Sequence, residues 1–195
     1  MLLNLCLPGQ CFLLLLCCGF WLPLVPAAAV ADESGAATEV PLSAEALAER
    51  ARQSLVVVRA TDRTGSDSGL GTGFVIEGGL IATAHHVIGD GREIRVELPG
   101  GKLVPVVEVY ASSSRLDLAI LRVADLQLPA LSLSADEKTP QGREVVALGH
   151  PEGFRNSIVS GVISGHQDIE GVEMLQLAMS IERGNSGGPV LDRQG

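Results

Sequence analysis

Short apolar runs separated by polar turns fill most of this 195-residue chain. Runs rich in valine, isoleucine and leucine, bounded by glycine, proline, aspartate or serine, are typical of β-strands. Ten runs fit this pattern and predict ten strands, at Leu55–Ala60, Gly71–Ile76, Leu80–Ala84, Glu93–Leu98, Pro105–Tyr110, Leu118–Val123, Glu144–Gly149, Asn156–Ser164, Met174–Ala178 and Pro189–Leu191. Residues 41–53 have a helical pattern instead, with Ser43 as the expected N-cap. We therefore expect an all-β fold that follows one short helix.

The predicted strands fall into two groups. The first six end at Val123 and the last four begin at Glu144, and the segment between them contains Pro129 and Pro140. Proline disfavours both helix and central strand, so this segment is predicted to cross from one unit to the next. We place the first unit at residues 55–128 and the second at 129–195.

The N-terminal segment has a different character. Leu2 to Val30 contains no charged residue, Cys11 to Leu24 is almost continuously apolar, and small residues from Ala27 to Ala31 follow. An apolar stretch before a small-residue site is typical of a secretory signal peptide, here residues 1–31. The alternative is an uncleaved membrane anchor over residues 11–30, since about 20 apolar residues span a bilayer. We expect a periplasmic or secreted protein with a leader and short helix at 32–54, or else a membrane-anchored one.

Cysteine positions and net charge narrow the class of protein further. All the cysteines lie in the proposed signal peptide, at Cys6, Cys11, Cys17 and Cys18. The mature chain would therefore have neither disulfides nor a thiol-bound metal. The formal net charge of −9 belongs to the part after Ala31. A net acidic surface argues against nucleic acid as a partner.

Three motifs carry the candidate chemistry. Ser186 lies in the septet Gly-Asn-Ser-Gly-Gly-Pro-Val, where flanking glycines can place a hydroxyl and backbone N–H groups on the same side of a tight turn. Serine needs a neighbouring base to act as a nucleophile, and His86, in Thr-Ala-His-His-Val, could supply it. Asp117, which opens Asp-Leu-Ala-Ile-Leu, could orient that histidine. The motifs occur in the order His, Asp, Ser, and together they predict a serine protease.

From about Leu55 to the last residue, the chain resembles the Deg/HtrA branch of the trypsin-like serine proteases. These three motifs and the glycine-rich segment Gly69–Val75 carry the resemblance. It implies two six-stranded antiparallel β-barrels with the catalytic residues in the cleft between them. Only nine residues follow Ser186, so we expect the second barrel to be incomplete and the chain to be the N-terminal part of a longer protein, with the end of the protease domain missing.

The resemblance assigns roles to individual residues. It implies that Ser186 attacks the peptide carbonyl, that His86 transfers the proton and that Asp117 orients His86. It also implies that the N–H groups of Gly184 and Ser186 form the oxyanion hole. Ser180 should lie near the floor of the primary substrate pocket, where the absence of a carboxylate favours a small or medium aliphatic side chain before the cut.

Several assignments have alternatives. The adjacent His85 could be the base, although the resemblance selects the histidine directly before Val87, and no third ligand at zinc spacing supports a metal site. Asp125 and Glu108 could replace Asp117, whose apolar successors predict that it is buried. His150 and His166 are expected to be solvated loop residues.

The sequence therefore favours a serine endopeptidase that cuts unfolded or misfolded envelope or secreted proteins and needs no cofactor. Its partners would be polypeptide substrates. Protein quality control, a homotrimer and a following PDZ domain are implied only by the resemblance. The main alternative is a catalytically inactive relative of the same fold that binds peptides without cutting them. An esterase of the α/β-hydrolase type is disfavoured, because there the nucleophile precedes its partners in the chain.

Overall fold

The computed structural model describes residues 41–134, 139–150 and 157–195, which lie within one compact unit, Glu39–Gly195. The predicted signal peptide and the leader up to residue 40 lie outside the described residues. The helices are α1 (Ala44–Ala51) and α2 (His85–Ile88), with short 3₁₀ turns η1 (Arg52–Ser54) and η2 (Glu77–Gly79). The strands are β1 (Leu55–Thr61), β2 (Asp67–Ile76), β3 (Leu80–Ala84), β4 (Glu93–Glu97), β5 (Leu103–Ser113), β6 (Leu118–Val123), β7 (Glu144–Gly149), β8 (Ser157–Ile169), β9 (Val172–Ala178) and β10 (Val190–Leu191).

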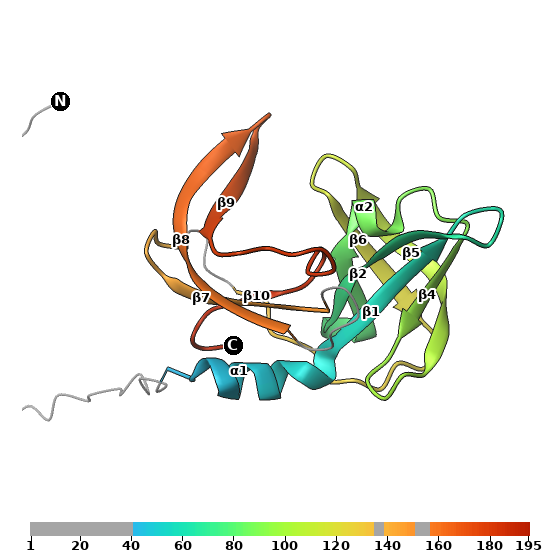
Figure 1. Ribbon diagram of the computed structural model, residues 1–195, viewed down its shortest axis with the longest axis horizontal. Coiled ribbons are helices and arrows are strands. Elements are labelled where there is room, and N and C mark those ends of the chain that lie inside the picture. The colour runs from blue at the N-terminus through green and yellow to red at the C-terminus, as the bar shows by residue number, and fades with distance from the viewer. Residues whose placement is uncertain (1–40, 135–138, 151–156) are drawn as a thin grey trace, which may run out of the picture. The chain divides into compact units, whose positions relative to one another are not determined.

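The first six strands close into a barrel in the order β1-β2-β3-β6-β5-β4, and every neighbouring pair is antiparallel (Figure 1). Alternate residues of these strands point inward, as the pleat of a strand requires. Val58, Val75, Ile81 and Leu121 are fully buried there. Closure leaves the barrel without a free edge. It is therefore a rigid support for the residues at its rim.

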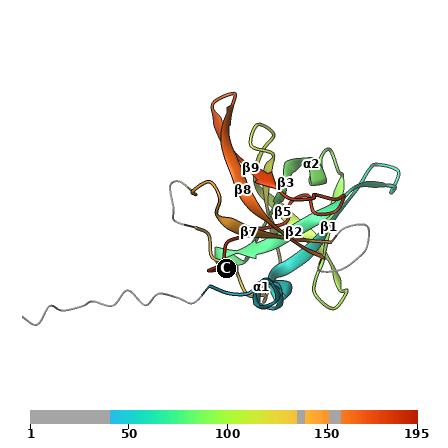
Figure 2. The same ribbon diagram turned by 60° about the vertical axis from the view of Figure 1, so that its left-hand side comes forward.

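The remaining strands form a four-stranded antiparallel sheet in the order β10-β7-β8-β9. β8 and β9 form a long hairpin that rises away from the rest of the sheet (Figures 1 and 2). At its tip, the guanidinium of Arg115, in the turn between β5 and β6, donates to the carbonyl of Glu170. The hairpin therefore reaches the barrel beside Asp117. These strands confirm the predicted all-β, trypsin-like fold with one complete barrel and an incomplete second one.

α1 connects the chain before the barrel to the second sheet. Ser43 caps it, accepting a hydrogen bond of 3.2 Å from the N–H of Ala46, as the sequence predicted. Leu47 and Ala51 are fully buried in a core that also contains Val146 and Leu148 of β7. α1 precedes all the strands and contributes no residue to the catalytic motifs. Its packing nevertheless stabilises the sheet that carries the nucleophile loop.

We predict that Leu47→Ala lowers the free energy of unfolding by about 2–5 kcal/mol, because the substitution leaves a cavity in this core. Urea denaturation measures the change. The matched control is Leu133→Ala, since Leu133 is 67% exposed, and there we expect a change within about 0.5 kcal/mol. Equal losses in the two variants would contradict the proposed role of α1 in the core.

Candidate active site

Asp117 and His86 are joined by two hydrogen bonds. Nδ1 of the His86 ring lies 2.6 Å from Oδ2 of Asp117, and the backbone N–H of His86 donates to Oδ1 at 2.8 Å. The N–H of His85 also donates to the Asp117 carbonyl, at 3.0 Å. Asp117 has φ of 48°, a left-handed conformation that aspartate tolerates better than most residues. The turn before β6 thus points its carboxylate at the first turn of α2.

These contacts determine which form of the histidine ring is present. A carboxylate can only accept a hydrogen bond, so Nδ1 of His86 carries a proton. In the neutral ring Nε2 then holds the free electron pair, which is the form that a general base needs. The sequence left His85 or His86 open as the base, and the ring that contacts Asp117 is that of His86.

The pKa of Asp117 lies below its usual value. Partial desolvation raises this pKa, but hydrogen bonds from the backbone and ring of His86, with the charges of His86 and His85, outweigh that effect. The prediction that Asp117 is buried is wrong, since its side chain is 48% exposed. Of the apolar residues after it, Ala119 and Leu121 are buried in the barrel, whereas Asp117 itself lies in the turn before β6. Its partner, however, is the predicted one.

The loop that carries Ser186 is attached to the first barrel through Thr72 of β2. The Thr72 hydroxyl donates to the carbonyl of Gly184 at 2.6 Å and accepts from the N–H of His150 at 3.0 Å. The N–H of Thr72 donates to the carbonyl of Ser186 at 2.8 Å. Thr72 is fully buried. One residue of the barrel therefore fixes two carbonyls of the nucleophile loop and the end of β7.

Two glycines make this close approach possible. A Cβ atom on Gly71 would lie 2.8 Å from the Ser186 carbonyl oxygen and 2.5 Å from a methyl group of Val87. Gly187 has φ of 79°, and a Cβ there would lie 2.3 Å from the Thr72 carbonyl oxygen. Side chains at these positions would separate the loop from the barrel. The glycines of the two sequence motifs therefore serve one contact.

The backbone N–H groups of Gly184 and Ser186 are available to a ligand. Thr72 turns the carbonyls of both residues toward the barrel. Among the described residues, neither of the two N–H groups has a hydrogen-bond acceptor. Unpaired N–H groups next to a candidate nucleophile can stabilise a developing oxyanion. The geometry is compatible with the role that the resemblance implied for these two residues.

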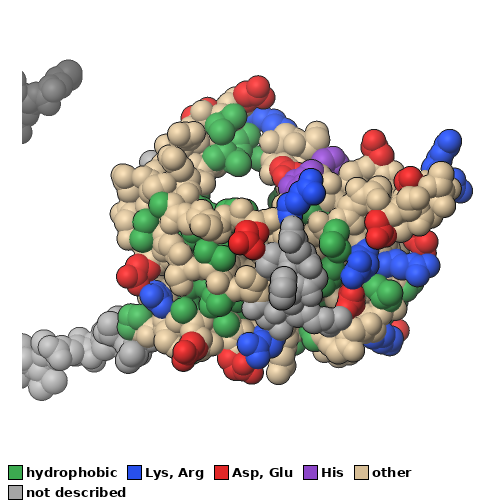
Figure 3. Space-filling view, in the orientation of Figure 1, with side chains coloured by type: hydrophobic (Ala, Val, Ile, Leu, Met, Phe, Trp, Pro, Cys, Tyr) green, Lys and Arg blue, Asp and Glu red, His purple; other side chains and the backbone are tan. Residues whose placement is uncertain are grey.

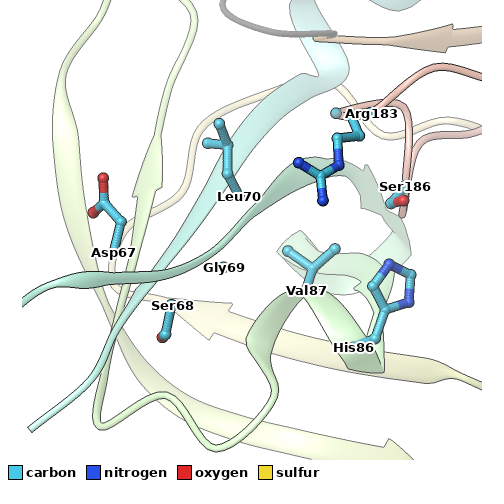
Figure 4. Close-up of a pocket in the computed structure, with 9 residues that line it drawn as sticks. Asp67, Ser68, Gly69, Leu70, His86, Val87, Arg183 and Ser186 are labelled. Atoms are coloured by element: carbon cyan, nitrogen blue, oxygen red, sulfur yellow. The ribbon is translucent and has the colours of Figure 1, made fainter.

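Ser186 and His86 open onto one cavity of about 530 Å³. Its wall includes Leu70 of β2, Val87 of α2 and Arg183, and the Ser186 side chain and the His86 ring lie next to each other at one end (Figure 4). No direct hydrogen bond joins Ser186 to His86 among the described residues. The molecule is hollowed on this face between the barrel and the β8–β9 hairpin (Figure 3). An extended peptide could reach Ser186 through the cavity.

The other sequence candidates lie elsewhere. Ser180 is exposed, two residues beyond the end of β9, and does not line this cavity. Asp125 lines a different cavity, and Glu108 pairs with Arg122 at 3.3 Å. Neither replaces Asp117 beside His86.

The structure corrects the expected solvation of one histidine and the expected location of another. His150 is only 8% exposed, because its backbone bonds to Thr72 and holds the end of β7 inside the molecule. The expectation that it is solvated is wrong. His166 is exposed, as expected, but it lies within β8 rather than in a loop, and its ring bonds to Glu173 and the Thr139 carbonyl. His150 directly follows β7, which ends where it was predicted, whereas β8 extends past its predicted end at Ser164 and so includes His166.

Sequence analysis missed Thr72 and Arg183. Thr72 was visible only as one residue of a glycine-rich strand, and its partner Gly184 lies 112 positions away. Arg183 precedes the nucleophile motif directly, and its exposure beside the cavity depends on the loop path. Only the adjacency of Arg183 to the motif could have drawn attention to it.

Comparisons with known proteins agree with this geometry. A family model described as "Trypsin-like peptidase domain" matches residues 71–195. Because the match covers well over half of the chain, the chain belongs to the trypsin-like peptidase family. Serine protease HTRA2, mitochondrial, from Bos taurus is 39% identical over 135 residues, which are 64% of this chain and 29% of that protein.

A probable periplasmic serine endoprotease DegP-like from Pseudomonas putida is 33% identical over 139 residues, or 69% of this chain and 29% of that protein. The crystal structure of the Rv3671c protease from M. tuberculosis, active form, superimposes with a TM-score of 0.64 at 28% identity. That superposition covers 75% of this chain and 68% of the other. The resemblance to the Deg/HtrA branch is confirmed. The chain spans less than a third of the length of these curated relatives.

The described residues contain neither a membrane-spanning helix nor a cluster of metal ligands. No helix in that part of the chain is long and apolar enough to cross a membrane. No three His, Cys, Asp or Glu side chains within the same residues are grouped so that they could hold a metal ion.

We predict that Thr72→Val lowers the free energy of unfolding by about 1–3 kcal/mol, because the Gly184 carbonyl and the His150 N–H lose their partner in a buried site. Urea denaturation measures the loss. Thr61→Val is the matched control, since the Thr61 hydroxyl makes only an exposed contact of 3.5 Å. If both variants are equally stable, the hydroxyl does not join the two units.

The depressed pKa of Asp117 predicts a pH dependence. Because the folded pKa is below the unfolded one, Asp117 stabilises the fold above the ordinary aspartate pKa of about 3.9, and this contribution is lost as pH falls through the folded pKa. We expect the wild type to be more stable than Asp117→Asn at pH 5–7, and the difference to shrink below about pH 4. Asp62, whose pKa is also lowered, is present in both proteins and cancels. A difference that does not change with pH would contradict this account.

Proposed function

We propose that this chain is the catalytic part of a serine endopeptidase that uses Ser186, His86 and Asp117. The observation that carries the proposal is the cavity beside Ser186, because the His86 ring on its wall is held by Asp117 in the form that can accept a proton. Family membership points to the same chemistry. No cofactor is needed for it.

The proposed reaction has two steps. Ser186 Oγ attacks the peptide carbonyl while Nε2 of His86 removes its proton, and the amine leaves with that proton. Water then attacks the acyl-enzyme, with His86 again acting as the base. The N–H groups of Gly184 and Ser186 would bind the oxyanion in both steps. Asp117 would stabilise the imidazolium without itself being protonated.

Further proposals concern the substrates, the cellular location and the oligomeric state. We propose polypeptide substrates in an unfolded or misfolded state, because an extended backbone is needed to bring a peptide bond to Ser186 in the cavity. An envelope or secreted location is supported by the periplasmic DegP-like relative and by the uncharged stretch before Asp32. A homotrimer would follow if the full-length protein assembles as Deg proteins do. Ser180 stays the proposed floor of the primary pocket.

A second candidate is a peptide-binding relative that does not cut. The missing hydrogen bond between Ser186 and His86 among the described residues favours it. In enzymes without bound substrate this hydrogen bond is often long and shortens when substrate binds, so the geometry is compatible with either function.

Degradation of unfolded casein separates the two functions. We expect the protein to cut casein and Ser186→Ala to lose the activity by roughly 10⁶-fold, because the nucleophile is gone. Ser132→Ala, which changes an exposed serine outside the site, should keep it. Binding of casein without any cleavage by the wild type would favour the non-cutting relative.

A further inference from the structure

The cavity beside Ser186 contains an arginine, Arg183, that has no partner in the described part of the chain. Arg183 is exposed, and among the described residues no hydrogen bond or ion pair involves its guanidinium. Figure 4 shows that group turned toward Leu70 and Val87, over the cavity rather than away from it. Arg193, further along the same segment, is instead paired with Glu144 at 2.9 Å. The cavity therefore presents an unsatisfied positive charge next to the nucleophile.

The position of the cavity indicates which part of a substrate would occupy it. Most of its wall comes from β2 and α2 of the first barrel, including His86, and the rest comes from the nucleophile loop, including Arg183. His86 is the residue that would deliver a proton to the departing amine. Ser180, proposed as the floor of the pocket for the residue before the cut, lies toward the second sheet and is not part of this wall. The cavity is therefore on the leaving-group side of Ser186.

We infer that this cavity binds the first two residues after the scissile bond and that Arg183 selects an acidic side chain among them. The inference rests on the proposed function, because it needs a peptide bond at Ser186. Guanidinium groups bind carboxylates through two parallel hydrogen bonds, which gives both attraction and orientation. A volume of about 530 Å³ is within the range of pockets that hold small ligands.

A second charge limits where the acidic residue can bind. Asp67 lines the same cavity at its far end, three positions before Leu70 on β2. In an extended strand that spacing is about 10 Å. Asp67 has no ion pair among the described residues, and it would repel a carboxylate placed deeper in the cavity. The acidic preference should therefore be confined to the end near Arg183.

Acyl transfer tests the inference directly. A peptide ester forms the acyl-enzyme, and added dipeptide amides compete with water for it, so product ratios report binding on the leaving-group side. We expect Glu-Ala-amide or Ala-Glu-amide to be accepted about two- to five-fold better than its glutamine counterpart, as for an exposed ion pair. Arg183→Gln should bring that ratio to one, and high salt should reduce it in the wild type.

The matched control is Arg92→Gln, which changes another exposed arginine, before β4 and outside the cavity. It should keep the wild-type preference. A ratio of one at both acceptor positions in the wild type, or a preference that survives Arg183→Gln, would overturn the inference. Ester hydrolysis without any acceptor reports the proposed function separately.

A binding measurement decides the inference even if no ester is hydrolysed. Ser186→Ala protein is titrated with Glu-Ala-amide, Ala-Glu-amide and their glutamine counterparts, and the His86 ring signals are followed by NMR. Tighter binding of a glutamate peptide, lost when Arg183→Gln is added, supports the inference whatever the turnover. Equal binding of each glutamate peptide and its counterpart overturns it.

Discussion

The buried hydroxyl of Thr72 is the interaction on which the candidate site depends. It bonds the carbonyl of Gly184, 112 positions later in the chain, and accepts the N–H of His150. In this way a closed barrel, which is rigid because it has no edges, positions a loop of the open second sheet. The His86–Asp117 pair is held by the barrel alone, so Thr72 is what places Ser186 in register with it.

The same interaction explains why the N–H groups of Gly184 and Ser186 are available. A buried or half-buried loop normally satisfies its backbone groups internally. Here the loop's carbonyls are satisfied by Thr72, while the two N–H groups have no acceptor among the described residues. Backbone polarity is thus divided, with acceptors toward the barrel and donors toward the cavity. Such a division suits a site where negative charge develops during the reaction.

The sequence predicted the architecture well, because strand periodicity and three local motifs carry it. The strand positions and the capped helix follow from local patterns, whereas the closed barrel and the pairing of His86 with Asp117 were implied by the family resemblance. The length of the β8–β9 hairpin did not follow, since its outer half is exposed and has no apolar pattern to signal a strand. The burial of His150 and the exposure of Asp117 were also missed. Both depend on how distant segments pack.

Long-range contacts account for the other omissions. Nothing near Thr72 in the sequence indicates a partner beyond position 180, and the position of the Arg183 guanidinium over the cavity depends on the path of the whole loop. A local reading identifies residues with suitable chemistry, whereas their mutual placement requires the fold.

The most direct test of the central claim is to identify the residue that a fluorophosphonate modifies. The protein is treated with the reagent, digested, and its peptides are sequenced by mass spectrometry. The account predicts one adduct, on Ser186. It should not form when the protein is unfolded in urea before the reagent is added, and it should be strongly reduced in Thr72→Val. Modification of a different serine, or none in the folded protein, would contradict the claim that this fold activates Ser186.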